Sequence, residues 1–157
     1  MELILVRHGE PQTGDAAPSV NPPLTDRGLR QAAAVGAFIP ALNVDVLVSS
    51  GMRRAHQTAL PAAENTGLEV LVDEHFAEID AGGGNYKAIH DIRNRGEEAW
   101  AEYLRDPFAA TGVDEAQFRH RVLDGLRDLM ANNRGRTVAL FTHGFPINLV
   151  ISEVLGV

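Results

Sequence analysis

Four short apolar runs alternate along the chain with longer stretches of helical periodicity. The runs occupy residues 2–6, 44–48, 68–72 and 137–141, and the first of them reads ELILV. Nearly continuous apolar runs of this length are typical of strands that are buried on both faces of a parallel sheet. Because these runs alternate with helical segments, we predict an α/β domain with a mostly parallel sheet.

The helices are predicted from their capping residues and from periodic apolar positions. Thr25 is a good N-cap for a helix that continues to about Ile39. A second helix is expected to start near Met52, and Pro61 is expected to kink or stop it. Further helical segments are expected over 86–105 (in part), 114–132 and 145–155.

Composition and charge narrow the classes of function. A length of 157 residues suits one domain, and the formal net charge of −7 disfavours nucleic acid or an anionic membrane as the main partner. The lack of cysteine excludes disulfides, thiolate zinc sites, iron–sulfur clusters and a cysteine nucleophile. We expect a cytoplasmic protein, because no apolar run approaches the length of a membrane span and no leader pattern precedes the first strand. The sequence is compatible with a homodimer.

Polar groups directly follow three of the four predicted strands. Arg7-His8-Gly9 follows the first strand, Ser49-Ser50 the second and Thr142-His143-Gly144 the fourth. In open α/β sheets, ligands bind beyond the carboxyl ends of the strands, so these groups converge on one pocket if the strands are neighbours. A helix that begins just after His143 would direct its first amides and the positive end of its dipole at an anion.

Four motifs, in order along the chain, resemble the histidine phosphatase superfamily in its phosphoglycerate-mutase-like branch. They are RHGE (7–10), PLTDRGLRQA (23–32), SSGMRRAHQTA (49–59) and FTHG (141–144). A looser fifth match, AEIDAGGG (77–84), is similar to the family's Glu-bearing segment after the third strand. The resemblance implies a phosphoglycerate-mutase-like fold, in which helices flank the sheet as a three-layer sandwich. It also implies a single catalytic domain over residues 1–157, with a small cap region at about 78–112.

The same resemblance implies which residues carry the chemistry. His8 would attack phosphorus through a ring nitrogen and form a phosphohistidine, which requires a neutral imidazole. Glu78 would protonate the leaving oxygen and later activate water, with Asp80 as the alternative acid. The phosphoryl oxygens would be held by the side chains of Arg7, Arg54 and His143 and by the backbone amides of Gly9 and Gly144. Fixed cationic donors of this kind stabilise the transferring phosphoryl group without a metal ion.

Several positions depart from the family pattern or have two interpretations. Gly112-Val113-Asp114 stands where relatives often carry Gly-Glu-Ser. An Asn that some relatives place soon after RHGE is missing, and Gln12 or Asn21 would have to replace it. Arg53 is expected to be solvated or salt-bridged. Three aromatic residues either line a substrate pocket or pack the cap, and packing is the preferred interpretation for Tyr86, Trp100 and Tyr103.

We expect a metal-independent phosphomonoesterase that needs no cofactor, acts on small phosphorylated metabolites and releases inorganic phosphate. Hydrolysis is preferred to a phosphoglycerate-type mutase because mutases of this branch are considerably longer. A phosphohistidine-protein phosphatase and a non-catalytic phosphate-binding module are further alternatives. A divalent-metal site built from His8, Glu10, Asp80 and His143 is disfavoured, because two neighbouring arginines would repel the cation. The identity of the substrate does not follow from the sequence.

Overall fold

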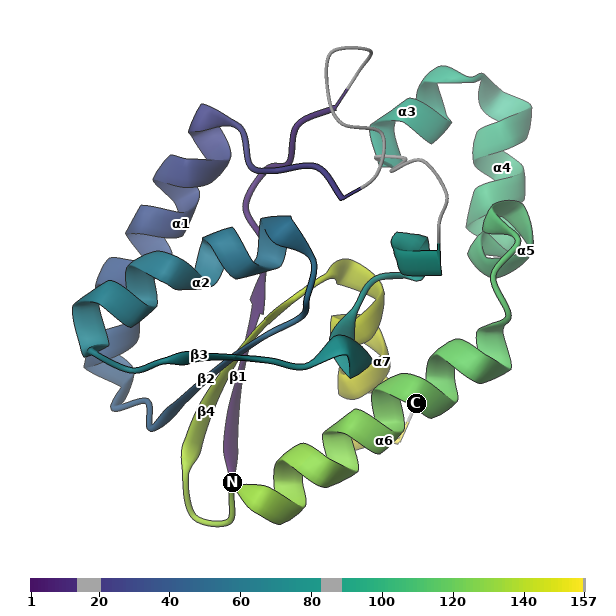
Figure 1. The fold of residues 1–157 in the computed structure, drawn as a ribbon. Coiled ribbons are helices and arrows are strands. Elements are labelled where there is room, and N and C mark those ends of the chain that lie inside the picture. Colours follow the sequence, from purple (N-terminus) through teal and green to yellow (C-terminus); the bar gives the residue numbers. More distant parts are fainter. Residues whose placement is uncertain (14–20, 83–88, 157) are drawn as a thin grey trace.

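The computed structural model describes residues 1–13, 21–82 and 89–156 of the chain, and a parallel sheet lies at its centre (Figure 1). In this part of the chain the sheet has four strands in the order β1-β4-β2-β3, and every neighbouring pair is parallel. The strands are β1 (Glu2–Arg7), β2 (Val46–Ser49), β3 (Val70–Val72) and β4 (Thr137–Thr142). The predicted parallel sheet is confirmed, and its register brings the carboxyl ends of β1, β4 and β2 to one edge.

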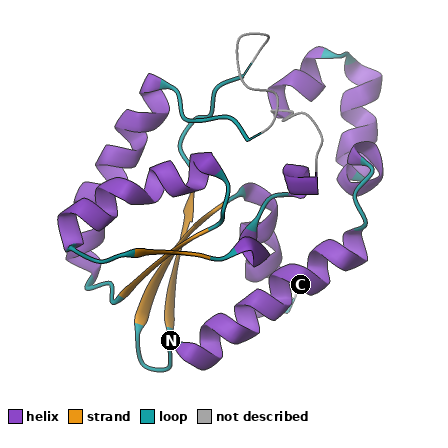
Figure 2. Ribbon diagram, in the orientation of Figure 1, coloured by secondary structure: helices purple, strands orange, loops and turns teal. Residues whose placement is uncertain are grey.

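Helices cover both faces of the sheet (Figure 2). On one face, α1 (Asp26–Phe38) packs against α2 (Arg53–Thr66), and α2 contacts β2, β3 and β4. On the other face, α6 (Glu115–Asn132) packs against α7 (Gly144–Leu155), which contacts β1. The three-layer α/β sandwich expected from the sequence is therefore the observed architecture.

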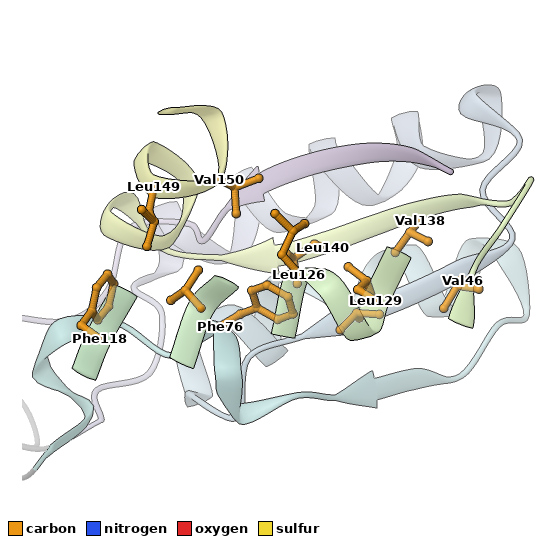
Figure 3. Close-up of a cluster of buried hydrophobic side chains, with 11 residues drawn as sticks. Val46, Phe76, Phe118, Leu126, Leu129, Val138, Leu140, Leu149 and Val150 are labelled. Carbon is orange, nitrogen blue, oxygen red and sulfur yellow. The ribbon is translucent and has the colours of Figure 1, made fainter. Parts of the chain in front are cut away.

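The core consists of two apolar clusters, one on each face of the sheet. Val138 and Leu140 point toward α6 and α7, where they join Phe76 in the cluster of Figure 3. Ala139 and Phe141 point the other way and join the cluster under α2. All four of these β4 residues are fully buried, because the side chains of a strand alternate between two covered faces. Burial of each large apolar side chain stabilises the fold by roughly 1.5–3 kcal/mol.

The helix ends show where tertiary packing overrides local signals. The Thr25 hydroxyl accepts a hydrogen bond from the Gly28 amide at 3.0 Å, so the predicted N-cap of α1 is confirmed. Pro61 does not stop the second helix, which continues to Thr66 and ends at Gly67 in the left-handed region. Pro61 packs closely on α1: a Cβ added at Gly36 would lie 2.5 Å from the Cβ of Pro61. This close approach of α1 and α2 requires the glycine.

The second strand begins later than the predicted range of 44–48. The backbone amide of Asp45 donates to the Thr137 carbonyl at 2.8 Å, and the Asp45 carboxylate accepts from the Thr137 amide at 2.8 Å. Asp45 thus bridges to the start of β4, and regular pairing of β2 begins one residue later, at Val46. Short 3-10 turns follow α1 and β3, namely η1 (Ile39–Leu42), η2 (Glu74–Phe76) and η3 (Ile79–Gly82).

The region expected to be partly helical over 86–105 contains two short helices. They are α3 (Ile89–Asn94) and α4 (Glu97–Arg105), separated at Gly96, whose φ of 115° no helix accommodates. A third helix, α5 (Pro107–Thr111), connects them to α6. Residues 83–88, which include Tyr86 and two glycines of the expected loop, lie outside the described residues. Within the described ranges, no helix is both long and apolar enough to cross a membrane.

Candidate active site

The sheet brings the two His-Gly pairs together at the carboxyl ends of β1 and β4. The His8 amide donates to the Thr142 carbonyl at 3.0 Å, so His8 lies beside the end of β4. The imidazole rings of His8 and His143 are 5.0 Å apart between centroids. The Ser50 amide donates to the Phe141 carbonyl at 3.0 Å, which places the end of β2 on the other side of β4. The expected convergence of the three strand ends is therefore observed.

The imidazole of His8 is oriented by one hydrogen bond to its own neighbour. Its Nδ1 atom lies 2.7 Å from the carbonyl oxygen of Gly9. A carbonyl only accepts, so Nδ1 carries the proton and Nε2 of the neutral ring keeps the lone pair. Burial, together with the positive charges of Arg54 and Arg7, lowers the pKa of His8 from 6.5 to about 4. Near neutral pH, His8 therefore presents an unprotonated Nε2, as a nucleophile requires.

His143 is fully buried, and its Nε2 atom lies 2.7 Å from the Ser50 hydroxyl. Burial, and then the charge of Arg54, lowers the pKa of His143 well below its ordinary value, so the neutral ring is favoured. When the Ser50 hydroxyl donates to Nε2, the ring proton is on Nδ1. Nδ1 is buried and has no hydrogen-bond partner among the described residues. A buried donor in this state favours a bound acceptor such as a phosphoryl oxygen.

The two arginines predicted to hold phosphate lie in different environments. Arg7, at the end of β1, is exposed, whereas the Arg54 side chain, at the start of α2, has 0% exposure. Nη2 of Arg54 donates to both carboxylate oxygens of Asp80, at 2.9 and 3.2 Å. The neighbouring Arg53 is exposed, as expected for consecutive helical residues that point about 100° apart. Arg7, His8 and Arg54 line one cavity of about 1570 Å³.

The two glycines of the site differ in their surroundings. The Gly9 amide, which we expected to face phosphate, donates instead to the Thr58 hydroxyl at 3.0 Å. Gly9 is required for packing, because a Cβ there would lie 2.6 Å from the Gly28 carbonyl oxygen. Gly144 lines the cavity at the first turn of α7, and the nearest group to a Cβ there would be the Glu78 carboxylate, at 3.8 Å. Gly144 therefore remains the better placed of the two glycines for phosphate contact.

Glu78 lies between the end of η2 and the start of α7. One carboxylate oxygen accepts from the Ile79 amide at 3.0 Å and the other from the Phe145 amide at 3.3 Å. Burial, with a smaller contribution from the charge of Asp80, raises the pKa of Glu78 above its ordinary value. The two amide hydrogen bonds and Arg54 oppose this shift. A carboxyl group whose pKa is raised in a cavity is suited to donate a proton.

Arg121, a residue that the sequence reasoning did not identify, fixes the backbone in front of Glu78. Its guanidinium donates to the carbonyls of Glu74 at 2.9 Å, His75 at 2.8 Å and Ala77 at 2.8 Å. The Arg121 guanidinium carbon also lies 5.1 Å from the centre of the Phe118 ring. The sequence feature that could have identified Arg121 is its position next to Val122, beside the apolar stripe of the helix predicted over 114–132.

The remaining candidates divide between the cavity wall and structural contacts. Tyr103 is buried and lines the cavity, and Trp100 stacks on it at 5.9 Å between ring centroids. Gln12 and Asn21, considered as phosphate ligands, make structural contacts here. The Gln12 side-chain amide donates to the Leu24 carbonyl at 3.4 Å, and the Asn21 side-chain oxygen accepts from the Arg53 backbone amide at 2.7 Å.

The four residues of the alternative metal site make separate contacts. Asp80 is paired with Arg54, and the Glu10 carboxylate accepts from the Thr25 hydroxyl at 2.7 Å. Among the side chains that the structure describes, no group of three or more His, Asp or Glu is arranged to hold a metal ion.

Known proteins that are similar to this chain include phosphatases and a probable mutase. The family model of the histidine phosphatase superfamily (branch 1) matches residues 3–157. Phosphoserine phosphatase 1 of Hydrogenobacter thermophilus is 28% identical over 163 residues, covering 100% of this chain and 77% of the relative. Probable phosphoglycerate mutase GpmB of Cronobacter sakazakii is 28% identical over 166 residues, covering 99% and 75%. The structure of a mycobacterial glucosyl-3-phosphoglycerate phosphatase superimposes with a TM-score of 0.81 at 24% identity, covering 99% and 79%, and shows the same fold.

Proposed function

The chain belongs to the histidine phosphatase superfamily, branch 1, and on this premise we propose that it hydrolyses small phosphorylated metabolites through a phosphohistidine at His8. The observation that carries the proposal is the orientation of His8. Its Nδ1 donates to the Gly9 carbonyl, which leaves Nε2 as the nucleophile in a cavity that Arg7 and Arg54 also line. Two of the relatives compared here carry phosphatase names, which supports hydrolysis of a phosphate ester.

In the first step, Nε2 of His8 attacks phosphorus as the bond from phosphorus to the ester oxygen breaks. The leaving oxygen takes the proton of Glu78, so the alcohol departs neutral and Glu78 becomes a carboxylate. The raised pKa of Glu78 supports this role, because it favours the protonated carboxyl group at the start of the step. The charge of the phosphoryl oxygens is held by Arg7, Arg54 and the Nδ1–H of His143.

In the second step, water attacks the phosphohistidine. The Glu78 carboxylate takes a proton from this water as its oxygen bonds to phosphorus, and the bond between phosphorus and His8 breaks. Inorganic phosphate leaves, His8 returns to its neutral form and Glu78 is protonated again. The side chains of the site supply nucleophile, acid, base and positive charge, so we propose a reaction that requires no metal ion.

We further propose that the chain forms one catalytic domain in which residues from about 78 to 112 cap the cavity. This is supported by three residues that line the cavity, one from each short helix: Ile92 of α3, Tyr103 of α4 and Thr111 of α5. The cavity of about 1570 Å³ exceeds the usual range for metabolite pockets, roughly 300–1000 Å³.

A phosphoglycerate-type mutase is the second candidate, because the Cronobacter relative carries that name. It would use the same first step, and the phosphohistidine would then pass to a second hydroxyl group instead of water. The two reactions differ only in the acceptor. Release of free phosphate, compared with interconversion of 2- and 3-phosphoglycerate, therefore distinguishes them.

The proposal is tested by a panel of phosphorylated metabolites, assayed for free phosphate with and without EDTA. We expect phosphate release that EDTA does not reduce and that His8→Ala abolishes. Loss of activity in EDTA, restored by zinc or magnesium, would contradict the metal-free reaction. Binding of phosphate without turnover of any ester, including p-nitrophenyl phosphate and phosphohistidine peptides, would favour a non-catalytic module.

A further inference from the structure

The cavity is asymmetric in charge. Its phosphoryl end carries Arg7 and Arg54 beside His8. Asp80 belongs to the phosphoryl end, because it is paired with Arg54. The described residues that line the rest of the cavity include three carboxylates besides Glu78, namely Glu74, Asp114 and Asp124, and Asp124 is paired with Arg127. Arg121 is the only arginine or lysine among the described lining residues of that part. Glu74 and Asp114 form no ion pair among the described residues, so the side of the cavity that would receive the alcohol part of a substrate carries more negative than positive charge.

The cationic groups on this side are already engaged. Arg121 directs three of its five N–H donors at backbone carbonyls, at 2.8 to 2.9 Å. His75 lies 2.8 Å from the Asp73 carboxylate, and His120 lies 2.6 Å from the Asp124 carboxylate. Each of these histidines therefore already contacts a carboxylate of the protein. On this side of the cavity, a carboxylate on the substrate would find no uncommitted arginine or lysine among the described lining residues.

The other lining groups on this side are mostly apolar. Side chains of Ile79, Ile92, Tyr103, Val113 and Phe145 line the cavity, and each comes from a different part of the chain. Apolar walls favour an uncharged alcohol with some hydrocarbon surface, and they raise the cost of burying an anion that has no partner.

Asp114 is a carboxylate of the cavity wall whose negative charge is not needed for the local structure. It caps α6 by accepting a hydrogen bond from the Gln117 amide at 3.0 Å. Ser or Asn would make the same capping contact without the charge. The cap therefore does not require a carboxylate at this point of the cavity wall, and neighbouring Val113 contributes no polar group.

We propose that the site selects phosphomonoesters whose alcohol part carries no carboxylate, with uncharged, partly apolar alcohols preferred. The proposal rests on the proposed function and names the substrate class of the same site. It sets this chain apart from the substrates in its relatives' names, because phosphoserine and phosphoglycerate both carry a carboxylate beside the phosphoryl group. Such a carboxylate would be repelled by the acidic residues and would lose hydration without an uncommitted cationic partner among the described residues of that part of the cavity.

Two substrate pairs that differ in the carboxylate test the proposal. They are glycerol 3-phosphate against 3-phosphoglycerate, and phosphoethanolamine against phosphoserine. We expect kcat/KM to favour the member without the carboxylate by about tenfold or more in both pairs. Equal values, or preference for the carboxylated member, would overturn the proposal. Failure of the proposed function has a different signature, because p-nitrophenyl phosphate would then not be hydrolysed either.

A matched pair of variants tests whether the charge of the cavity wall causes the preference for substrates without a carboxylate. Asp114→Asn removes one charge from the cavity wall and keeps the cap, whereas Glu115→Gln removes one charge from the same turn of α6 at a residue that does not line the cavity. We expect Asp114→Asn to shift the kcat/KM ratio toward 3-phosphoglycerate by roughly two- to fivefold, and Glu115→Gln to leave the ratio unchanged. No shift, or an equal shift in both variants, would contradict selection by the cavity wall. Circular dichroism confirms that both variants are folded.

Discussion

Nη2 of Arg54 lies 2.9 Å from Oδ1 and 3.2 Å from Oδ2 of Asp80, and the Arg54 side chain is completely buried. This contact gives the two neighbouring acids of the segment different environments. Asp80 is already engaged as the acceptor for a guanidinium. Glu78 instead accepts from two backbone amides beside α7, and its pKa is raised. The geometry therefore favours Glu78 over Asp80 as the proton donor.

Arg54→Ala is expected to reduce kcat/KM by roughly 10²–10³-fold, because a charge-assisted phosphate contact in a buried site contributes a few kcal/mol to transition-state binding. Arg53→Ala is the matched control, since Arg53 is exposed and its only contact with Asn21 is through the backbone amide. Steady-state kinetics on one substrate measure both effects. Equal losses in the two variants would show that Arg54 does not bind the phosphoryl group.

Glu78→Gln is expected to slow the hydrolysis of sugar or glycerol phosphates far more than that of p-nitrophenyl phosphate. An alkoxide needs a proton as it leaves, whereas nitrophenolate leaves without one, and general-acid catalysis is worth roughly 10²–10⁴-fold. Asp80→Asn serves as the comparison. If only Asp80→Asn shows this dependence on the leaving group, Asp80 is the acid. If neither variant shows it, the proton comes from another group.

Glu78 should also reduce the stability of the fold as the pH rises. Its folded pKa is raised above the unfolded value of 4.5, so its favourable contribution is fully present below that value and is lost as pH rises through the folded pKa. Gln cannot ionise, so the gain in Tm of Glu78→Gln over wild type should grow as the pH rises above 4.5. Glu64→Gln, at an exposed position of α2, should show no such trend. A pH-independent difference in Tm would contradict a raised pKa.

The free enzyme should show a depressed pKa for His8. The unfolded value is 6.5 and the folded value is about 4, so the unfolded state binds the proton first as the pH falls. The stability contributed by neutral His8 is therefore complete above pH 6.5 and is lost toward pH 4, by roughly 3 kcal/mol in all. NMR titration of the imidazole signals measures this pKa, with His8→Gln providing the assignment. Titration of His8 near its ordinary value would contradict a buried, neutral nucleophile.

Arg121→Ala should impair the same chemistry as Glu78→Gln without removing the acid itself. Loss of three hydrogen bonds to the carbonyls of residues 74–77 releases the backbone that positions Glu78. We expect a lower Tm and a greater loss on alkyl phosphates than on p-nitrophenyl phosphate, with partial rescue by Arg121→Lys. Arg119→Ala, at an exposed position of the same helix, is the control. Equal losses on both substrates would indicate a purely structural role for Arg121.

The parts of the site that lie at strand ends were predictable from the sequence, because parallel strands bring their carboxyl ends to one edge. His8 and His143 meet for this reason, and the resemblance to a family added Arg54 and Glu78. Thr25 was predictable as a cap because its contact is local. Pro61 does not stop the helix, which was one of its two expected effects, and its fit against Gly36 of α1 depends on tertiary packing.

The contacts that were not predictable join distant residues through the backbone. The Thr58 hydroxyl accepts from the Gly9 amide across 49 positions, and Arg121 reaches carbonyls 44 to 47 positions away. Backbone amides and carbonyls are nearly the same in every residue type, so a side chain can bond to the backbone of almost any residue. A single sequence therefore does not indicate which two positions such a hydrogen bond joins. The pairing of Arg54 with Asp80 was also unforeseen, because three other acidic residues lie within the same short segment, 73–80.

The most direct test of phosphoryl transfer through His8 is capture of the phosphoenzyme. Wild-type protein is mixed with a radiolabelled phosphate ester and quenched in alkali within the first turnover, because phosphohistidine survives base and is lost in acid. We predict base-stable, acid-labile label on wild type, located at His8 by peptide mapping, and none on His8→Ala. Label on His8→Ala, label at another residue, or wild-type turnover with no labelled protein in a single-turnover time course would contradict His8 as the nucleophile.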